Sequence, residues 1–156
     1  MSVDELIASL RTRGHNVDSS IPASPDAIHQ IELAIQRALP PSYRRFLETH
    51  GALFIYDSGV SGVWDGNRVD LTGGTVLNDT TVLQSEGGLP EGLLAVGVHE
   101  DGAYCLDFNR QRPDGECPIV NFERGSIQHN RPVAATFEEW LIEFRLKPWL
   151  RDPNPA

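Results

Sequence analysis

The spacing of apolar residues changes twice along this 156-residue chain, and these changes constrain the fold more than any other feature of the sequence. Up to residue 51 the apolar residues recur at the three- and four-residue intervals of helices. Residues 53–122 instead hold short β-branched or aromatic runs separated by Asp-Gly and Gly-Gly, which are typical of strands joined by turns. A helical pattern returns at residue 136. This order predicts a single α+β domain in which an antiparallel or mixed sheet is flanked by N-terminal helices and a C-terminal helix.

Three helices are expected in the first third of the chain. Ser2 and Glu5 fit a capping box at the start of the first helix. Ser24 followed by Pro25 predicts the start of the second, because proline loses nothing where the N–H has no partner. The third follows Pro40-Pro41 and ends before Gly51. The closing helix begins at Thr136, with Glu139 as its capping partner. Its expected apolar stripe is Phe137, Trp140, Leu141 and Phe144.

The middle of the chain predicts strands and one ambiguous segment. Gly102 suits a tight turn between two antiparallel strands. Residues 75–86 could form a short helix or a strand, and their periodicity does not decide between the two. The expected strands are residues 53–56, 59–64, 68–71, 93–98, 103–108 and 118–122. The domain organisation predicted from these patterns is a helix and linker over residues 1–24, an α+β domain over 25–146 and a proline-rich tail over 147–156.

Negative charge is concentrated in the predicted strand region. The chain has 13 Lys and Arg against 22 Asp and Glu, a net charge of −9. Residues 51–120 contain eleven acidic and three basic residues and therefore carry −8 of that total. These acids are Asp57, Asp65, Asp70, Asp79, Glu86, Glu91, Glu100, Asp101, Asp107, Asp114 and Glu116. Such a field repels phosphate backbones, which argues against direct nucleic-acid binding, and it favours a basic protein partner.

Composition and motifs exclude several other classes. No apolar run approaches the roughly 18–20 residues of a membrane span, and the acidic N-terminus is unlike a signal peptide. Two cysteines are too few for a disulfide scaffold, so we expect a reduced, cytoplasmic protein in which Cys105 and Cys117 are buried as small hydrophobes. The five histidines are scattered, and the sequence predicts no metal site and no cofactor. The nearest approach to a nucleophile motif is GVSGV at residues 59–63, which lacks the final glycine of G-x-S-x-G. No catalytic residue is predicted.

Four segments together resemble the SUKH superfamily, which includes fungal cell-wall assembly regulators and bacterial immunity proteins. Residues 39–47 read LPPSYRRFL and resemble its LP-x-x-Y-x-x-F-L signature. Residues 89–97, LPEGLLAVG, are similar to its strand motif, and residues 100–107, EDGAYCLD, to its glycine-containing hairpin. Residues 136–141, TFEEWL, match its closing helix. At residues 50–52 the sequence His-Gly-Ala departs from the Asn-Gly-Gly turn usual in the family.

The resemblance implies a non-enzymatic protein that binds and neutralises a bacterial toxin domain. Toxins countered by this family are often nucleases, and the basic cleft of a nuclease would complement an acidic surface. Position at expected loop tips, together with charge or aromatic character, selects the candidate partner-binding residues. They are Asp57, Trp64, Asp65, Asp70, Glu100 and Asp101. Trp64 could equally be a core residue. His50, at the end of an apolar helical stripe, is expected to be a half-buried residue at a helix end.

Two other functions remain compatible with the sequence. The same fold could serve as an intracellular interaction or regulatory module, as in the fungal members. An acid/base hydrolase using two of the acids in the middle of the chain would require a concave pocket and a carboxylate of raised pKa. The sequence does not determine the oligomeric state.

Overall fold

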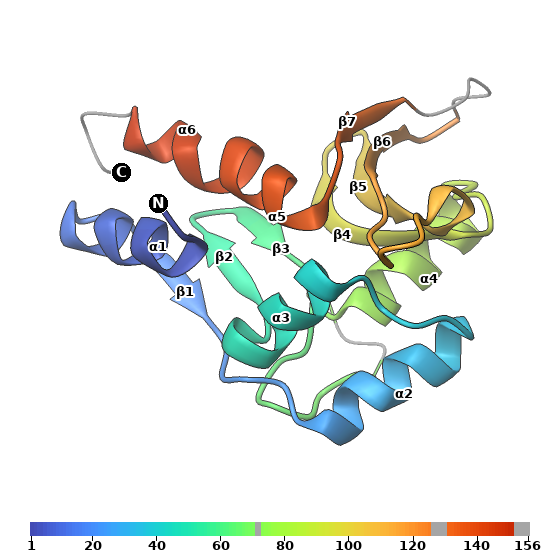
Figure 1. Cartoon of the computed structure of the whole chain (residues 1–156). Helices are drawn as coiled ribbons and strands as arrows, with labels where there is room; N and C mark the ends of the chain where they lie inside the picture. The colour runs from blue at the N-terminus through green and yellow to red at the C-terminus, as the bar shows by residue number, and fades with distance from the viewer. Residues whose placement is uncertain (71–72, 126–130, 152–156) are drawn as a thin grey trace.

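The computed structural model describes residues 1–70, 73–125 and 131–151, and it confirms the predicted single α+β domain (Figure 1). The N-terminal elements are α1 (Val3–Thr12), β1 (Val17–Ser19), α2 (Pro25–Ile35), α3 (Pro41–His50), β2 (Leu53–Ile55) and β3 (Ser58–Val60). The later elements are α4 (Val76–Glu86), β4 (Leu93–His99), β5 (Gly102–Asp107), the 3₁₀-helix η1 (Phe108–Arg110), β6 (Ile119–Glu123), β7 (Pro132–Ala134), α5 (Phe137–Trp140), the π-helix η2 (Leu141–Leu146) and α6 (Lys147–Leu150).

Three of the four predicted helix starts are confirmed by side-chain caps, and α3 begins at Pro41, as predicted, without one. Ser2 Oγ accepts the backbone N–H of Glu5 at 3.1 Å, and the Glu5 carboxylate accepts that of Ser2 at 3.2 Å, which is a complete capping box. Ser24 Oγ and Thr136 Oγ1 accept backbone N–H groups at the starts of α2 and α5. These side chains satisfy donors that have no partner inside the helix.

Two antiparallel sheets meet at Ser61. The first has the order β1-β2-β3 and the second β4-β5-β6-β7. The backbone N–H of Ser61, just after β3, donates to the carbonyl of Val96 in β4 at 2.8 Å. The register between β4 and β5 shifts between Ala95 and Gly97. The backbone N–H of Ala95 donates to Thr80 Oγ1 in α4 at 2.9 Å. This bulge lets the middle of β4 bond to elements on both sides.

The remaining polar groups of Ser61 bind two helices. The hydroxyl of Tyr43, a fully buried residue of α3, donates to the Ser61 carbonyl at 2.7 Å. Ser61 Oγ donates to the Asp79 carboxylate in α4. Burial, and then the nearby charge of Asp79, raises the pKa of Tyr43 well above its ordinary value, so its hydroxyl stays a donor. We call Ser61 with Tyr43, Val96 and Asp79 the Ser61 junction.

Apolar side chains cover both faces of the second sheet. One face packs with the N-terminal helices and the C-terminal helical run around the buried Phe137 and Trp140. The opposite face packs under α4 in a smaller cluster. That cluster consists of Leu83, Leu89, Leu93, Ala95, Ala103, Cys105, Val120 and Phe122. Successive side chains of these strands point to opposite faces of the sheet and therefore contribute to two separate apolar clusters.

The closing helix differs from the prediction at its centre. Residues 141–146 form a π-helix, and Leu141 and Leu146, five residues apart, are both buried. The wider turn moves Phe144 out of the predicted stripe, and it is 38 % exposed. Arg145 turns inward instead. Its guanidinium carbon lies 5.3 Å and 5.1 Å from the ring centroids of Tyr104 and Trp140, and its Nε donates to the Gly59 carbonyl at 3.2 Å.

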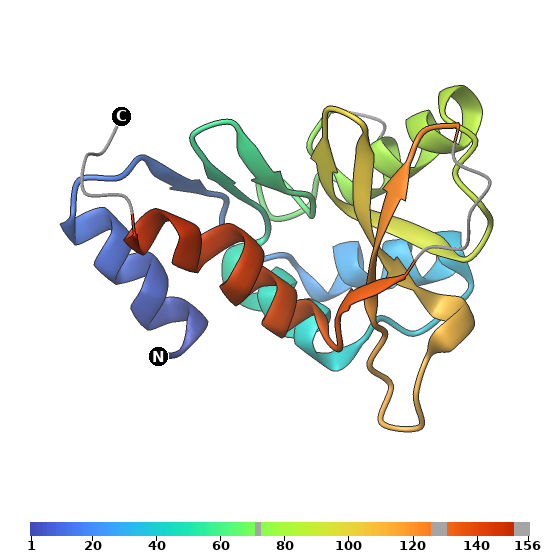
Figure 2. The same cartoon turned by 90° about the horizontal axis from the view of Figure 1, so that it is seen from above.

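The predicted linker and tail contain regular structure. Residues 17–19, expected within the linker, form β1, which pairs with β2. Residues 147–150, expected in the tail, form α6, and α1 lies beside this end of the chain (Figures 1 and 2). Trp149 contacts Tyr56 and His15, with ring centroids 4.7 Å and 5.9 Å away. This aromatic contact with Tyr56 of the β2–β3 turn therefore holds α6, which the sequence placed in a proline-rich tail, against the fold.

Other predictions for the middle of the chain have mixed outcomes. The ambiguous segment 75–86 contains helix α4, capped by Thr75. Residues 68–70 form no strand and join Trp64 by one isolated bridge, while residue 71 lies outside the described residues. The strand expected at 59–64 stops at Val60, and β7 was not expected.

Replacing Tyr43 with phenylalanine tests the Ser61 junction. The variant leaves the buried Ser61 carbonyl without its hydroxyl donor, and we expect a loss of about 1–2 kcal/mol in the free energy of unfolding, measured with urea. Tyr104→Phe is the matched control, because the Tyr104 hydroxyl makes no hydrogen bond to the described residues. Equal stabilities of the two variants would contradict the structural role of Tyr43.

Removing the Trp149 side chain tests the order of the C-terminal segment. Because Trp149 is partly buried, we expect Trp149→Ala to lower the free energy of unfolding by about 2 kcal/mol, less than the 3–5 typical of a core tryptophan. Pro148→Ala, an exposed change in the same helix, should have little effect. A frayed tail would leave both variants as stable as the parent in thermal and urea unfolding.

Candidate functional site

The six predicted partner-binding residues lie on three connections around the first sheet and β4. Asp57 is at the β2–β3 turn, and Glu100 and Asp101 form the β4–β5 turn. Figure 2 shows these two hairpins projecting toward the same side of the molecule. The other three residues, Trp64, Asp65 and Asp70, belong to the segment between β3 and α4. All five acids are exposed.

The segment that carries Asp65 is held against a part of the fold other than the two hairpins. The backbone N–H of Asp65 donates to Ser20 Oγ at 2.8 Å, and its carboxylate pairs with Arg68 at 2.8 Å. Asp65 therefore lies against the β1–α2 connection, and its charge is partly balanced. The Asp70 carbonyl accepts the Thr75 hydroxyl at 2.7 Å. The structure thus gathers Asp57, Glu100 and Asp101 on one side but does not place all six residues in one patch.

The negative field is unevenly compensated. The three arginines of residues 51–120 pair with Asp65, Asp107 and Asp114. Asp79 and Glu116 instead accept hydrogen bonds from serine hydroxyls. The hairpin-tip acids Asp57, Glu100 and Asp101 form no ion pair with any described residue. We call these three residues the acidic tips.

A pocket of about 230 Å³ opens between the two hairpins, beside the acidic tip Asp57. We call it the acidic pocket because Asp57 and Asp79 both line it. Its other lining residues are Phe54, Gly59, Val60, Ser61, Gly74 and Val98. Asp79 is only partly exposed, and its carboxylate also accepts the backbone N–H of Gly74 at 3.4 Å. The pocket therefore combines anionic and apolar walls.

Trp64 supports this pocket from behind. Its ring stacks on Phe54 with centroids 5.7 Å apart and an interplanar angle of 23°. Its Nε1–H donates to the Gly74 carbonyl at 3.1 Å. Trp64 is half-buried, so it is neither a full core residue nor a free loop-tip anchor. Trp64 instead holds two walls of the acidic pocket in place, and its part in partner binding stays a prediction.

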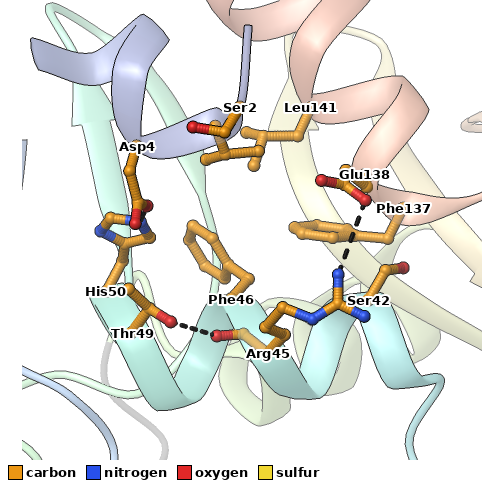
Figure 3. A pocket seen from close by; sticks show the side chains of 11 residues that line it. Ser2, Asp4, Ser42, Arg45, Phe46, Thr49, His50, Phe137, Glu138 and Leu141 are labelled. Carbon is orange, nitrogen blue, oxygen red and sulfur yellow. Dashed lines mark hydrogen bonds and ion pairs between the residues drawn. The ribbon is translucent and has the colours of Figure 1, made fainter.

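A second pocket, of about 140 Å³, lies between the start of α1, one side of α3 and the start of α5 (Figure 3). The rings of Phe46 and Phe137, with centroids 5.2 Å apart, form part of its lining. Two polar contacts lie at its edges, a hydrogen bond between His50 Nε2 and Asp4 at 2.8 Å and an ion pair between Arg45 and Glu138 at 3.6 Å. His50 is partly buried at the end of α3, as expected, and it ties α3 to α1.

The second pocket does not assemble a nucleophile and a base. Ser42 Oγ donates to Glu116 at 2.9 Å, and Thr49 Oγ1 donates to the Arg45 carbonyl at 2.8 Å. Ser2 Oγ is the cap of α1. Each hydroxyl beside His50 is therefore engaged in the fold, whereas an activated nucleophile requires a hydrogen bond to its base. The His50–Asp4 hydrogen bond joins α3 to α1, and the Arg45–Glu138 ion pair joins α3 to α5.

Neither cysteine has the environment of a reactive thiol. Cys105 and Cys117 are fully buried and unpaired with each other, which confirms their predicted burial. Burial raises the pKa of Cys117 to about 12, with Asp107 and Glu116 contributing, and raises that of Cys105 further. Ser61 of the GVSGV segment is likewise a structural residue. Among the described residues, His, Cys, Asp and Glu side chains form no group of three suited to a metal ion.

Of the residues that line the acidic pocket, the sequence identified only Asp57 as a site residue, and the aromatic and anionic side chains that it missed are Phe54 and Asp79. Asp79 lies in the segment 75–86, whose conformation the sequence left open, and Phe54 looked like an ordinary strand residue. Only the contact between β3, β4 and α4 places both beside Asp57. No local motif marks either residue.

The fold and these sites define a one-domain α+β protein with acidic hairpin tips and no assembled catalytic dyad in the pockets described. The chain belongs to the SUKH_5 family (SMI1-KNR4 cell-wall), whose family model matches residues 3–146. The superfamily predicted from the four segments is therefore confirmed. None of the described helices is both long and apolar enough to cross a membrane.

Two relatives extend this comparison. An uncharacterized protein, YnaB, from Bacillus subtilis (strain 168) is 27% identical over 141 residues, which cover 85% of this chain and 86% of that protein. The crystal structure of a protein from Pseudomonas syringae pv. tomato has the same fold, with a TM-score of 0.61 and 17% identity. That match covers 93% of this chain and 99% of the other.

Thiol labelling tests the burial of the two cysteines. We expect iodoacetamide to modify neither at pH 8 in the native protein and both in denaturant, as counted by mass spectrometry. The free energy of unfolding should also fall as the pH rises above about 8.5, because unfolded thiols then release protons that the folded state retains. Rapid native labelling of either cysteine, with kinetics independent of unfolding, would contradict this environment.

Proposed function

We propose that this chain is a non-enzymatic immunity protein that binds and neutralises a bacterial toxin domain through the acidic tips. The observation that carries the proposal is the shared orientation of two hairpins whose tip carboxylates form no ion pair within the described residues (Figure 2). A basic surface, such as the substrate cleft of a nuclease, would complement them. Exposed charges of this kind accelerate encounter and select the partner.

Membership of the SUKH_5 family supports a protein-interaction role in general. The hydrolase alternative finds less support in the geometry. Asp79, the less exposed of the two acidic-pocket carboxylates, accepts hydrogen bonds from Ser61, Gly74 and Asn78, and these contacts hold the fold together. A regulatory module of the same fold would use the same surface and differs only in its partner.

A growth assay tests the proposed function. A toxin domain encoded beside this gene is expressed with and without the chain, and we expect the chain to restore growth. Neutralising the tips with Asp57→Asn, Glu100→Gln and Asp101→Asn should weaken binding of the purified toxin domain about tenfold at low salt, since exposed ion pairs contribute up to about 1 kcal/mol each. The effect should shrink at high salt.

A variant of equal charge controls for net charge. Asp26→Asn, Glu48→Gln and Glu143→Gln remove three exposed acids from α2, α3 and η2 and should leave affinity nearly unchanged. Equal weakening by both triple variants would show that only total charge matters. If the parent chain fails to restore growth against every toxin domain encoded by a neighbouring gene, the immunity role is contradicted.

A further inference from the structure

The acidic pocket has the walls of a receptor for one flat cationic group. Asp57 and Asp79 supply carboxylates, and the ring of Phe54 supplies an aromatic surface. Gly59 pairs with Phe54 across β2 and β3, and a Cβ at Gly59 would lie 2.7 Å from the Phe54 ring. The glycine therefore leaves room for the ring to lie across β3. Trp64 stacks on Phe54 and fixes it further.

Asp79 is a partly buried charge whose contacts are all neutral. Ser61, Gly74 and Asn78 donate to its carboxylate, and no described lysine, arginine or histidine pairs with it. Arg145 reaches the Gly59 carbonyl but belongs to the other face of the sheet. A Cβ at Gly97 would meet Arg145 and Trp140, whereas the next residue, Val98, lines the pocket.

We propose that the acidic pocket receives one arginine side chain of the partner protein. This inference rests on the proposed function and names the group that the partner inserts. A guanidinium can stack on Phe54 while its N–H groups donate to carboxylates, a geometry that the ammonium group of lysine cannot reproduce. The volume of about 230 Å³ suits a single side chain, since pockets for small-molecule ligands usually measure about 300–1,000 Å³. Val98, 41 % exposed, offers apolar contact to the aliphatic stem.

Titration with N-acetyl-arginine amide tests the pocket without the partner. In ¹H–¹⁵N NMR spectra of the full chain we expect shifts at the amides of Gly59, Ser61, Gly74 and Val98, with a Kd on the order of millimolar. N-acetyl-lysine amide should bind at least about threefold more weakly because it lacks the planar fork. N-acetyl-citrulline amide, which has the same shape without the charge, should produce no saturable shifts.

Variants then assign the binding to this pocket. Asp57→Asn changes an exposed residue and should weaken binding of the arginine probe about fivefold without affecting folding. Asp79→Asn should weaken binding to a similar extent. Its single amide oxygen can accept either the Ser61 hydroxyl or the Gly74 and Asn78 donors, so this variant also costs stability, and its folding is verified by urea unfolding before the titration. The control Glu91→Gln removes another exposed acid, one outside the acidic pocket, and should leave binding of the arginine probe unchanged. Shifts spread evenly over exposed acids, or equal effects of Asp57→Asn and Glu91→Gln, would overturn the proposal.

The same variants separate this inference from the immunity role. If the probe binds the pocket but no neighbouring toxin domain is neutralised, the receptor site stands and the proposed function fails. If a toxin domain binds with an affinity unaffected by Asp57→Asn and Asp79→Asn, the function stands and the arginine site is overturned.

Discussion

The backbone and side chain of Ser61 join four elements that are distant in sequence, and the acidic pocket depends on this contact. Its N–H binds the bulged β4, its carbonyl accepts the Tyr43 hydroxyl of α3, and its hydroxyl donates to Asp79 of α4. Each of these groups would cost free energy if buried without a partner. The junction therefore fixes the spacing of the two sheets and, with it, the distance between the β2–β3 and β4–β5 hairpins.

The same junction explains why a tyrosine occupies the middle of the LPPSYRRFL segment. A phenylalanine could fill the same apolar volume, but the buried Ser61 carbonyl requires a donor. On the other face, Arg145 performs a comparable role between Tyr104 and Trp140 while bonding to Gly59. Polar contacts at the middle of β3 and just after its end thus hold a short strand that has little apolar surface of its own.

The distribution of charge suits recognition of a basic protein. Arginines pair with Asp65, Asp107 and Asp114, and these ion pairs stabilise local turns. The charge that remains at the hairpin tips faces solvent, where it acts at a distance of about one Debye length. The acidic pocket beside those tips adds a partly desolvated site, where a charge contact is stronger and more selective than on the open surface.

The sequence by itself determined the helix starts, the α+β class and the family, because caps, turn residues and apolar spacing act locally. Ser2, Ser24 and Thr136 bond within one helical turn, and each could be predicted from its neighbours. Only the tertiary structure decided the conformation of residues 75–86, the π-turn that exposes Phe144 and the inward position of Arg145. It also decided the acidic pocket, since Asp79 lines the same pocket as Asp57 only because α4 packs against Ser61 and β4. Contacts between residues so far apart in the sequence leave no periodic pattern of residues, so they could not be predicted from the sequence.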